Sequence, residues 1–156
     1  MKSVTAKRFV CGVVVLWALD PASSLRAQVS IGTWVRQSDA SAGGGLTMTV
    51  EVCCNGGRRF IYRINGGGDF VMTIESPMDG TDVPVLVAGK PTGETMGIKR
   101  VDDHHTFTVL KMNGNPFGTS KAALSADGKT LNVENEITST VGGRIAGKRT
   151  ETWLRK

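Results

Sequence analysis

Apolar and polar residues alternate in short runs along the chain from residue 32 to residue 155. Successive side chains of a β-strand point to opposite faces, so a period of two is typical of strands that bury one face. Glycine, asparagine and aspartate separate the runs and permit the positive φ angles that tight hairpins need. The predicted turns are Asn55-Gly56-Gly57, Asn65-Gly66-Gly67-Gly68, Met78-Asp79-Gly80-Thr81, Asn113-Gly114-Asn115-Pro116 and Asp127-Gly128.

This pattern predicts an all-β fold of consecutive antiparallel strands, with little or no helix after the first 27 residues. About eight to ten strands are expected to close into a single up-and-down barrel. Residues 117–124 and 149–155 are strands with weaker alternation. The rows expected to face inward are Leu46, Met48, Val50, Val52 and Cys54, then Phe60, Tyr62 and Ile64, then Phe70, Met72 and Ile74, then Val83, Val85 and Val87, then Met96 and Ile98, then Phe107 and Val109, and finally Leu131, Val133 and Ile137.

The first residues have the character of a secretory signal peptide. A positively charged start over residues 2–8 precedes an apolar run over residues 9–19, which is too short to span a bilayer. Small residues over 23–27 follow, as they do before a cleavage site. A cleaved signal is therefore favoured over an uncleaved N-terminal anchor.

Cleavage is expected after Ala27, with Ser24 as the alternative, so that residues 1–27 are removed and residues 28–156 form one β-barrel domain. The removed segment holds four of the 19 basic and one of the 14 acidic residues, so the net charge falls from +5 to +2. The mature chain then lacks the basic surface of a nucleic-acid-binding protein. It has no apolar run of transmembrane length, and we expect an exported protein, periplasmic or extracellular.

The mature chain keeps two cysteines, Cys53 and Cys54, which are adjacent. Consecutive Cα atoms lie about 3.8 Å apart, closer than the roughly 4.4 Å lower limit of ordinary disulfides. On a strand, the two side chains would also point to opposite faces. We therefore expect one buried thiol and one surface thiol, with a redox or metal role for the pair as the minor alternative.

Four short motifs bear comparison with known barrel proteins. Gly32-Thr33-Trp34 opens the first predicted strand, as a Gly-x-Trp motif opens the first strand of lipocalins and a similar motif opens fatty-acid-binding proteins. The others are Asp79-Gly80-Thr81-Asp82-Val83-Pro84-Val85, Lys99-Arg100-Val101-Asp102 and Ser125-Ala126-Asp127-Gly128-Lys129-Thr130-Leu131. Together they resemble a group of small exported bacterial proteins with lipocalin-like barrels of the calycin type, mostly without assigned activity. The resemblance implies a barrel that binds small hydrophobic molecules, and it implies no reaction.

The resemblance also implies a structural role for two residues. In lipocalins a tryptophan of the first strand closes one end of the barrel beneath a basic residue of the last strand. Trp34 matches this tryptophan, and Arg155 is the candidate cation for a cation–π contact. Fatty-acid-binding proteins place a helical lid between their first two strands, but residues 38–45 are too few for two helices. Any cavity is therefore expected to be open at that end, or plugged by side chains.

Residues with catalytic or metal-binding chemistry are scarce. His104 and His105 are the only histidines, and no Gly-x-Ser-x-Gly motif is present, so we expect neither an enzyme nor a cofactor. The run Asp102-Asp103-His104-His105 has the composition of a metal cluster. Consecutive side chains on a strand diverge, however, and a polar run between two apolar ones is most simply a solvated hairpin turn.

Three polar residues fall on apolar rows and are the candidate ligand-binding residues. Arg100 continues the row of Met96 and Ile98, where its guanidinium would pair with the carboxylate of a fatty-acid-like ligand. Lys111 similarly continues the row of Phe107 and Val109, and Tyr62 offers a hydroxyl. The favoured alternative is that Arg100 and Lys111 lie at strand ends and extend to the rim, because a buried unpaired charge is costly.

Two functional classes fit this sequence. The first is an exported, non-enzymatic barrel that binds a small hydrophobic or amphipathic molecule. The second is a protein-interaction or structural module of the cell envelope with a fully packed interior. A cavity large enough for a ligand favours the first class, and a filled core favours the second. The ligand, the protein partner and the oligomeric state do not follow from the sequence.

Overall fold

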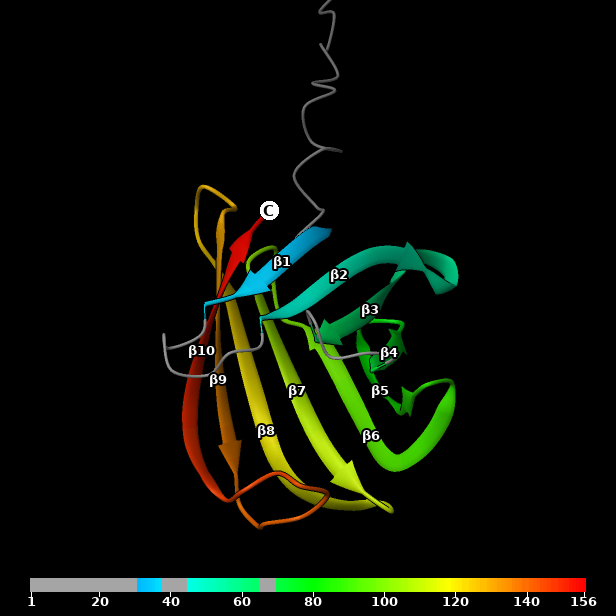
Figure 1. The fold of residues 1–156 in the computed structure, drawn as a ribbon. Helices are drawn as coiled ribbons and strands as arrows, with labels where there is room; N and C mark the ends of the chain where they lie inside the picture. Colours follow the sequence, from blue (N-terminus) through cyan, green and yellow to red (C-terminus); the bar gives the residue numbers. More distant parts are fainter. Residues whose placement is uncertain (1–30, 38–44, 65–69) are drawn as a thin grey trace, which may run out of the picture.

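The computed structural model describes residues 31–37, 45–64 and 70–156, so the predicted signal peptide and the Asn65–Gly68 turn lie outside the described residues. The described residues form ten antiparallel strands in a closed barrel (Figure 1). Each strand pairs with its neighbours in sequence. The strands are β1 (Gly32–Arg36), β2 (Leu46–Cys53), β3 (Gly57–Ile64), β4 (Val71–Ser76), β5 (Asp79–Val87), β6 (Lys90–Arg100), β7 (His105–Met112), β8 (Asn115–Leu124), β9 (Thr130–Ile137) and β10 (Gly147–Arg155).

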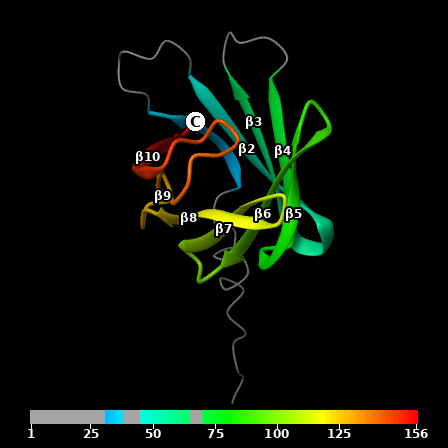
Figure 2. The same ribbon diagram turned by 90° about the horizontal axis from the view of Figure 1, so that it is seen from below.

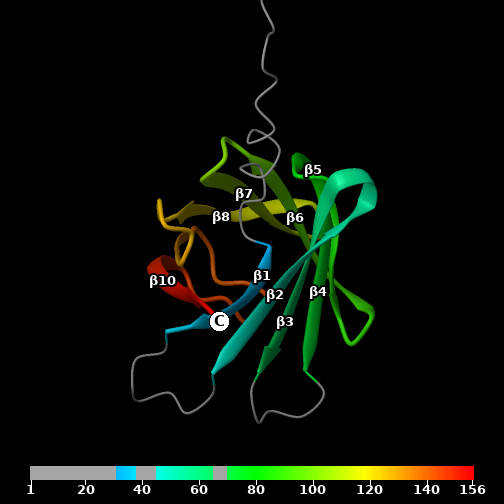
Figure 3. The same cartoon turned by 90° about the horizontal axis from the view of Figure 1, so that it is seen from above.

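The barrel closes between its first and last strands. β1 pairs with β10 through Trp34 opposite Arg155 and Arg36 opposite Trp153. Closure leaves neither strand with a free edge, and the views from below and from above show the strands arranged as a ring (Figures 2 and 3). The predicted all-β up-and-down barrel is confirmed. Within the described residues, no helix is long and apolar enough to cross a membrane.

Several tight turns lie where the sequence predicted them, but Asp79, Gly80 and Thr81 of one predicted turn already belong to β5. Asn113 and Gly114, between β7 and β8, both have positive φ, at 51° and 82°. Two such residues in succession match the right-handed twist of the strands that they join. Between β2 and β3 the chain makes a short 3₁₀ turn, Cys54–Gly56. One further turn, Ala88-Gly89 between β5 and β6, has no asparagine or aspartate to mark it.

The barrel interior contains two groups of buried side chains. Trp34, Met48, Val50, Leu131 and Trp153 pack together near the pairing of β1 with β10. The second group consists of Ile74, Val85, Met96, Ile98, Leu110, Phe117 and Ile137. Most of these residues belong to the rows predicted to face inward, but Val52 and Ile64 are exposed, because they lie at strand ends.

The predicted orientation of β7 is wrong. Thr106, Thr108 and Leu110 face the interior, whereas Phe107 and Val109 are half-buried on the other face. Direct partners share one face of a sheet, and the inward-facing Met96 and Ile98 of β6 are opposite Leu110 and Thr108. The neighbouring strand therefore decides the orientation of β7.

Cys53 and Cys54 form a disulfide, so the prediction of two separate thiols is wrong. The prediction assumed extended backbone at both residues. β2 ends at Cys53, and Cys54 begins the 3₁₀ turn with φ of 46°, so the alternation of side chains stops between them. Cys54 is exposed and Cys53 is partly exposed.

Candidate ligand-binding site inside the barrel

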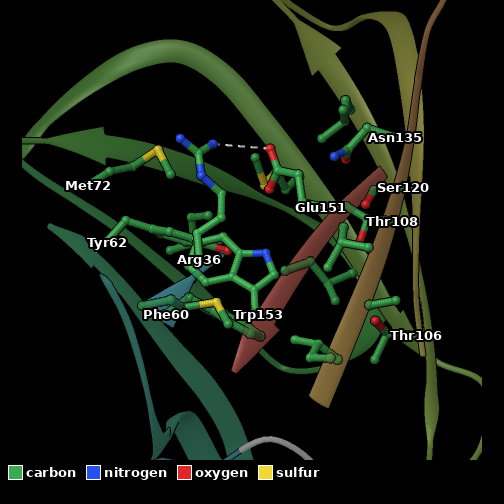
Figure 4. Close-up of a pocket in the computed structure, with 18 of the residues that line it drawn as sticks. Arg36, Phe60, Tyr62, Met72, Thr106, Thr108, Ser120, Asn135, Glu151 and Trp153 are labelled. Carbon is green, nitrogen blue, oxygen red and sulfur yellow. Dashed lines mark hydrogen bonds and ion pairs between the residues drawn. The ribbon is translucent and has the colours of Figure 1, made fainter. Parts of the chain in front are cut away.

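A cavity of about 260 Å³ lies inside the barrel (Figure 4). It is lined by residues from every strand except β5 and by three residues outside the strands, Met78, His104 and Arg144. The apolar lining residues are Leu46, Met48, Phe60, Met72, Ile74, Met78, Met96, Ile98, Leu110, Ala122, Leu131, Val133 and Trp153. The polar lining residues are Arg36, Tyr62, His104, Thr106, Thr108, Ser120, Asn135, Arg144 and Glu151.

Trp34 and Arg155 form the contact that the family resemblance implies. Trp34 is fully buried, and the guanidinium carbon of Arg155 lies 5.3 Å from the centre of its ring. Arg155 also donates hydrogen bonds to the carbonyl oxygens of Gly128, at 3.2 Å, and Ile31. Trp34 does not line the cavity, so these two residues join the ends of the barrel strands rather than contact a ligand.

Tyr62, on β3, does line the cavity. Its ring meets the ring of Trp153 edge to face, with centres 5.9 Å apart and planes at 71°. Burial raises the pKa of Tyr62 far above its usual value, and the nearby Glu151 carboxylate adds to this shift. The hydroxyl therefore stays protonated and can donate a hydrogen bond to a ligand.

Arg36 and Glu151 form an ion pair in the cavity wall. The Arg36 Nη1 atom lies 3.3 Å from Oε1 of Glu151, and about a third of each side chain is exposed. Strand alternation places both residues here, because Arg36 follows Trp34 by two positions and Glu151 precedes Trp153 by two. The sequence predictions missed this pair, although the same period-two rule applied to the two tryptophans identifies it.

A second ion pair joins the β9–β10 connection to the barrel. Nη2 of Arg144 lies 2.9 Å from Oε1 of Glu94, and Nε of Arg144 lies 3.4 Å from Oε2. Glu94, on β6, is nearly fully buried. Val141, in the same connection as Arg144, packs against the apolar core. The connection is thus held against one end of the barrel, visible below β8 and β9 in Figure 1.

Uncharged polar side chains line one wall of the cavity. Thr108 on β7 is directly opposite Ser120 on β8, and Ser120 is opposite Asn135 on β9. In Figure 4 these residues lie on one side of the cavity, with Phe60 and Tyr62 on the other. Thr108 was missed because β7 was given the opposite orientation, and Ser120 was missed because no inward row was predicted for residues 117–124.

The structure separates the three predicted ligand-binding residues. Tyr62 lines the cavity, whereas Arg100 and Lys111 do not. Arg100 lies at the end of β6, where its exposed guanidinium binds the Asp103 carboxylate and the Asp102 carbonyl oxygen. This matches the alternative of an arginine at the rim.

Lys111 is on the outer face of the barrel, where it pairs with Asp82. Its predicted inward orientation is wrong for the same reason as that of Phe107 and Val109. Leu110, the residue before it, takes the inward position.

Residues 102–104 form an exposed turn between β6 and β7, and the exposed His105 begins β7. The Asp102 carboxylate accepts hydrogen bonds from the backbone N–H groups of His104, at 2.7 Å, and His105, at 2.8 Å. These hydrogen bonds lower the pKa of Asp102, and the one from the His104 backbone has the largest effect. The carboxylate thus stabilises the turn itself. His104 lines the cavity at this end.

Comparisons with known proteins support the fold. No protein-family model matches the chain, and no curated protein matches it. Among solved structures, a point mutant of the fluorescent protein UnaG is similar, with a TM-score of 0.59 and 10% sequence identity. The match covers 81% of this chain and 95% of the UnaG chain. At this identity the likeness shows the fold alone, which is a closed β-barrel of the fatty-acid-binding-protein type.

Proposed function

We propose that this protein is a non-enzymatic barrel that binds one small hydrophobic or amphipathic molecule in its interior. The observation that carries the proposal is the cavity of about 260 Å³ and its largely apolar lining. Protein interiors contain few voids larger than a water molecule. This cavity is large enough for several water molecules, and its volume is slightly below the roughly 300–1,000 Å³ of known ligand pockets.

The alternative, an interaction module with a fully packed interior, fits the cavity less well. A catalytic role also has little support. Within the described part of the chain, no cavity-lining hydroxyl is hydrogen-bonded to a histidine or carboxylate that would activate it as a nucleophile. The fold likeness to UnaG supports the barrel architecture on which the proposal depends.

Export to the periplasm or the cell exterior remains part of the proposal. It depends on the signal-peptide character of residues 1–27. In that setting the ligand would be a molecule met in the cell envelope or outside the cell.

Binding of a neutral fluorescent probe, N-phenyl-1-naphthylamine, tests the proposed function. We expect the wild-type protein to bind it, and native mass spectrometry of protein purified from its own host to show a co-purified small molecule. Ala122→Phe places a ring in the cavity and is expected to abolish probe binding. The matched control is Ala123→Phe on the opposite face of the same strand, which should keep it.

Both variants must remain folded, as judged by circular dichroism and thermal unfolding. Absence of probe binding and of any co-purified molecule would favour the interaction module. Equal binding by the two variants would place the probe outside the barrel.

A further inference from the structure

The chemistry of the cavity wall indicates what kind of ligand it accepts. Thr108, Ser120 and Asn135 present two hydroxyls and one amide in a row across three strands. Directly opposite residues have Cβ atoms about 5 Å apart, so one planar polar group spans two of them. Within the described residues, none of these three side chains has a hydrogen-bond partner. Their hydrogen-bonding capacity is therefore available to a ligand in the cavity, with water as the competitor.

The charged residues of the cavity already have partners. Arg36 is paired with Glu151, and Arg144 with Glu94. These are the arginines that line the cavity within the described part of the chain, and no lysine there lines it. Both cations are therefore neutralised by carboxylates of the protein.

Resting on the proposed function, we propose that the cavity selects an uncharged ligand with an apolar body and a hydrogen-bonding edge, such as an amide or a hydroxyl. The edge binds the row of Thr108, Ser120 and Asn135, and the two ion pairs discriminate against carboxylates.

A carboxylate would meet two penalties in this cavity. It would lose its hydration without gaining an unpaired cation, and burial of an unpaired charge is costly. It would also lie in the same small cavity as the carboxylate of Glu151. An amide of the same shape carries no charge, and it can both donate to and accept from hydroxyl and amide side chains. Tyr62 adds another donor on the opposite side of the cavity.

A matched pair of probes separates charge from shape. 1-Naphthamide and 1-naphthoate have the same ring system and nearly the same volume, and they differ in the charge of the head group. Isothermal titration calorimetry at neutral pH measures both dissociation constants. We expect the wild-type protein to bind the amide at least about tenfold more tightly than the carboxylate.

Two variants test the assigned groups. Glu151→Gln removes the partner of Arg36, so naphthoate should gain about tenfold in affinity while naphthamide changes little. Its control is Glu136→Gln, which removes an exposed carboxylate paired with Lys148 on the outer face. Thr108→Val keeps the shape of the side chain but removes the hydroxyl, and should weaken naphthamide about fivefold. Thr119→Val, on the outer face of β8, is its control.

The outcomes distinguish this inference from the proposed function. If the wild type binds neither naphthalene probe nor N-phenyl-1-naphthylamine, the proposed function fails and the inference fails with it. If it binds naphthoate as tightly as naphthamide, the barrel binds ligands but charge selection is refuted. If Glu151→Gln and Glu136→Gln change naphthoate binding equally, the ion pair has no role in selection. If Thr108→Val and Thr119→Val leave naphthamide affinity equal, the polar row does not bind the edge.

Discussion

At the scale of single residues, Trp34 connects the hydrophobic core to the pair of strands that closes the barrel. It is fully buried, packs with Trp153, Met48 and Leu131, and lies beneath Arg155. A large buried aromatic residue at the seam between the first and last strands stabilises both the core and the closing pair.

We expect Trp34→Ala to lower the free energy of unfolding by about 3–5 kcal/mol, because it removes a large buried side chain and leaves a cavity. Urea unfolding followed by far-UV circular dichroism measures the loss. The control is Leu154→Ala, which removes a half-exposed side chain from β10. It should lower the free energy of unfolding by much less than Trp34→Ala does. Similar losses in the two variants would show that closure does not depend on Trp34.

Arg100 and Lys111 give a second prediction at this scale. Both lie outside the cavity, so Arg100→Met and Lys111→Met should leave the affinity for N-phenyl-1-naphthylamine unchanged within about twofold. Fluorescence titration measures it. Fluorescent fatty-acid probes test directly whether Arg100 binds a carboxylate. A large loss of fatty-acid affinity in Arg100→Met alone would restore the role that the sequence predicted for this arginine.

Individual residues also show what alternation can and cannot predict. Tyr62 was correctly placed in the interior, because it lies between apolar residues in the middle of its strand. Period-two alternation also predicts that Arg100 faces inward. It lies at the end of its strand, however, where the side chain reaches solvent. Arg36 and Glu151 were missed because neither interrupts an apolar row, and only their spacing of two from a tryptophan marks them.

At the scale of elements, the strands follow from local sequence, but their orientation depends on their neighbours. β7 carries threonines on one face and large apolar residues, Phe107 and Val109, on the other. Hydrophobicity alone predicts that these larger residues face the interior. The structure shows that they face outward. Pairing with β6 fixes the actual orientation, and the threonine face then becomes part of the cavity wall. The candidate site was unpredictable to that extent.

Three turns contain or border on an aspartate whose hydrogen bonds make stability depend on pH. Asp79, Asp102 and Asp127 each accept a hydrogen bond from the backbone N–H group two residues later. The connections between β4 and β5, β6 and β7, and β8 and β9 contain these aspartates or border on them, and alternate connections of an up-and-down barrel lie at the same end. Backbone hydrogen bonds lower the pKa values of Asp79 and Asp102, and a hydrogen bond from the Ser125 hydroxyl is the main cause for Asp127.

Because these pKa values are lowered in the folded state, the unfolded chain binds protons first as the pH falls. The stability that the three carboxylates contribute is present above their ordinary pKa of 3.8 and is lost as the pH falls below it. Urea midpoints measured across this range should decrease more steeply for the wild type than for a variant in which all three are replaced by asparagine. Parallel curves would refute the role of these turns.

At the scale of the whole molecule, the barrel combines a small net charge with an internal cavity and an exposed disulfide. The proposed removal of residues 1–27 would lower the net charge from +5 to +2, which is too small for strong long-range steering of a charged partner. The Cys53–Cys54 disulfide lies at the β2–β3 turn and uses both cysteines of the predicted mature chain. Disulfides persist in oxidising compartments, which agrees with the proposed export.

The proposed export can be tested at the N-terminus of the native protein. We expect the native protein to begin at or near Gln28, because a positive start, an apolar run and small residues precede that position. N-terminal sequencing identifies the first residue, and intact-mass measurement with and without a reducing agent reports whether the two cysteines of the mature chain are oxidised. Val14→Asp, a charge placed within the apolar run, should leave the precursor in the cytosol with Met1 retained. A wild-type protein recovered from the cytosol with Met1 intact would refute export, whereas the barrel and its cavity would stand unchanged.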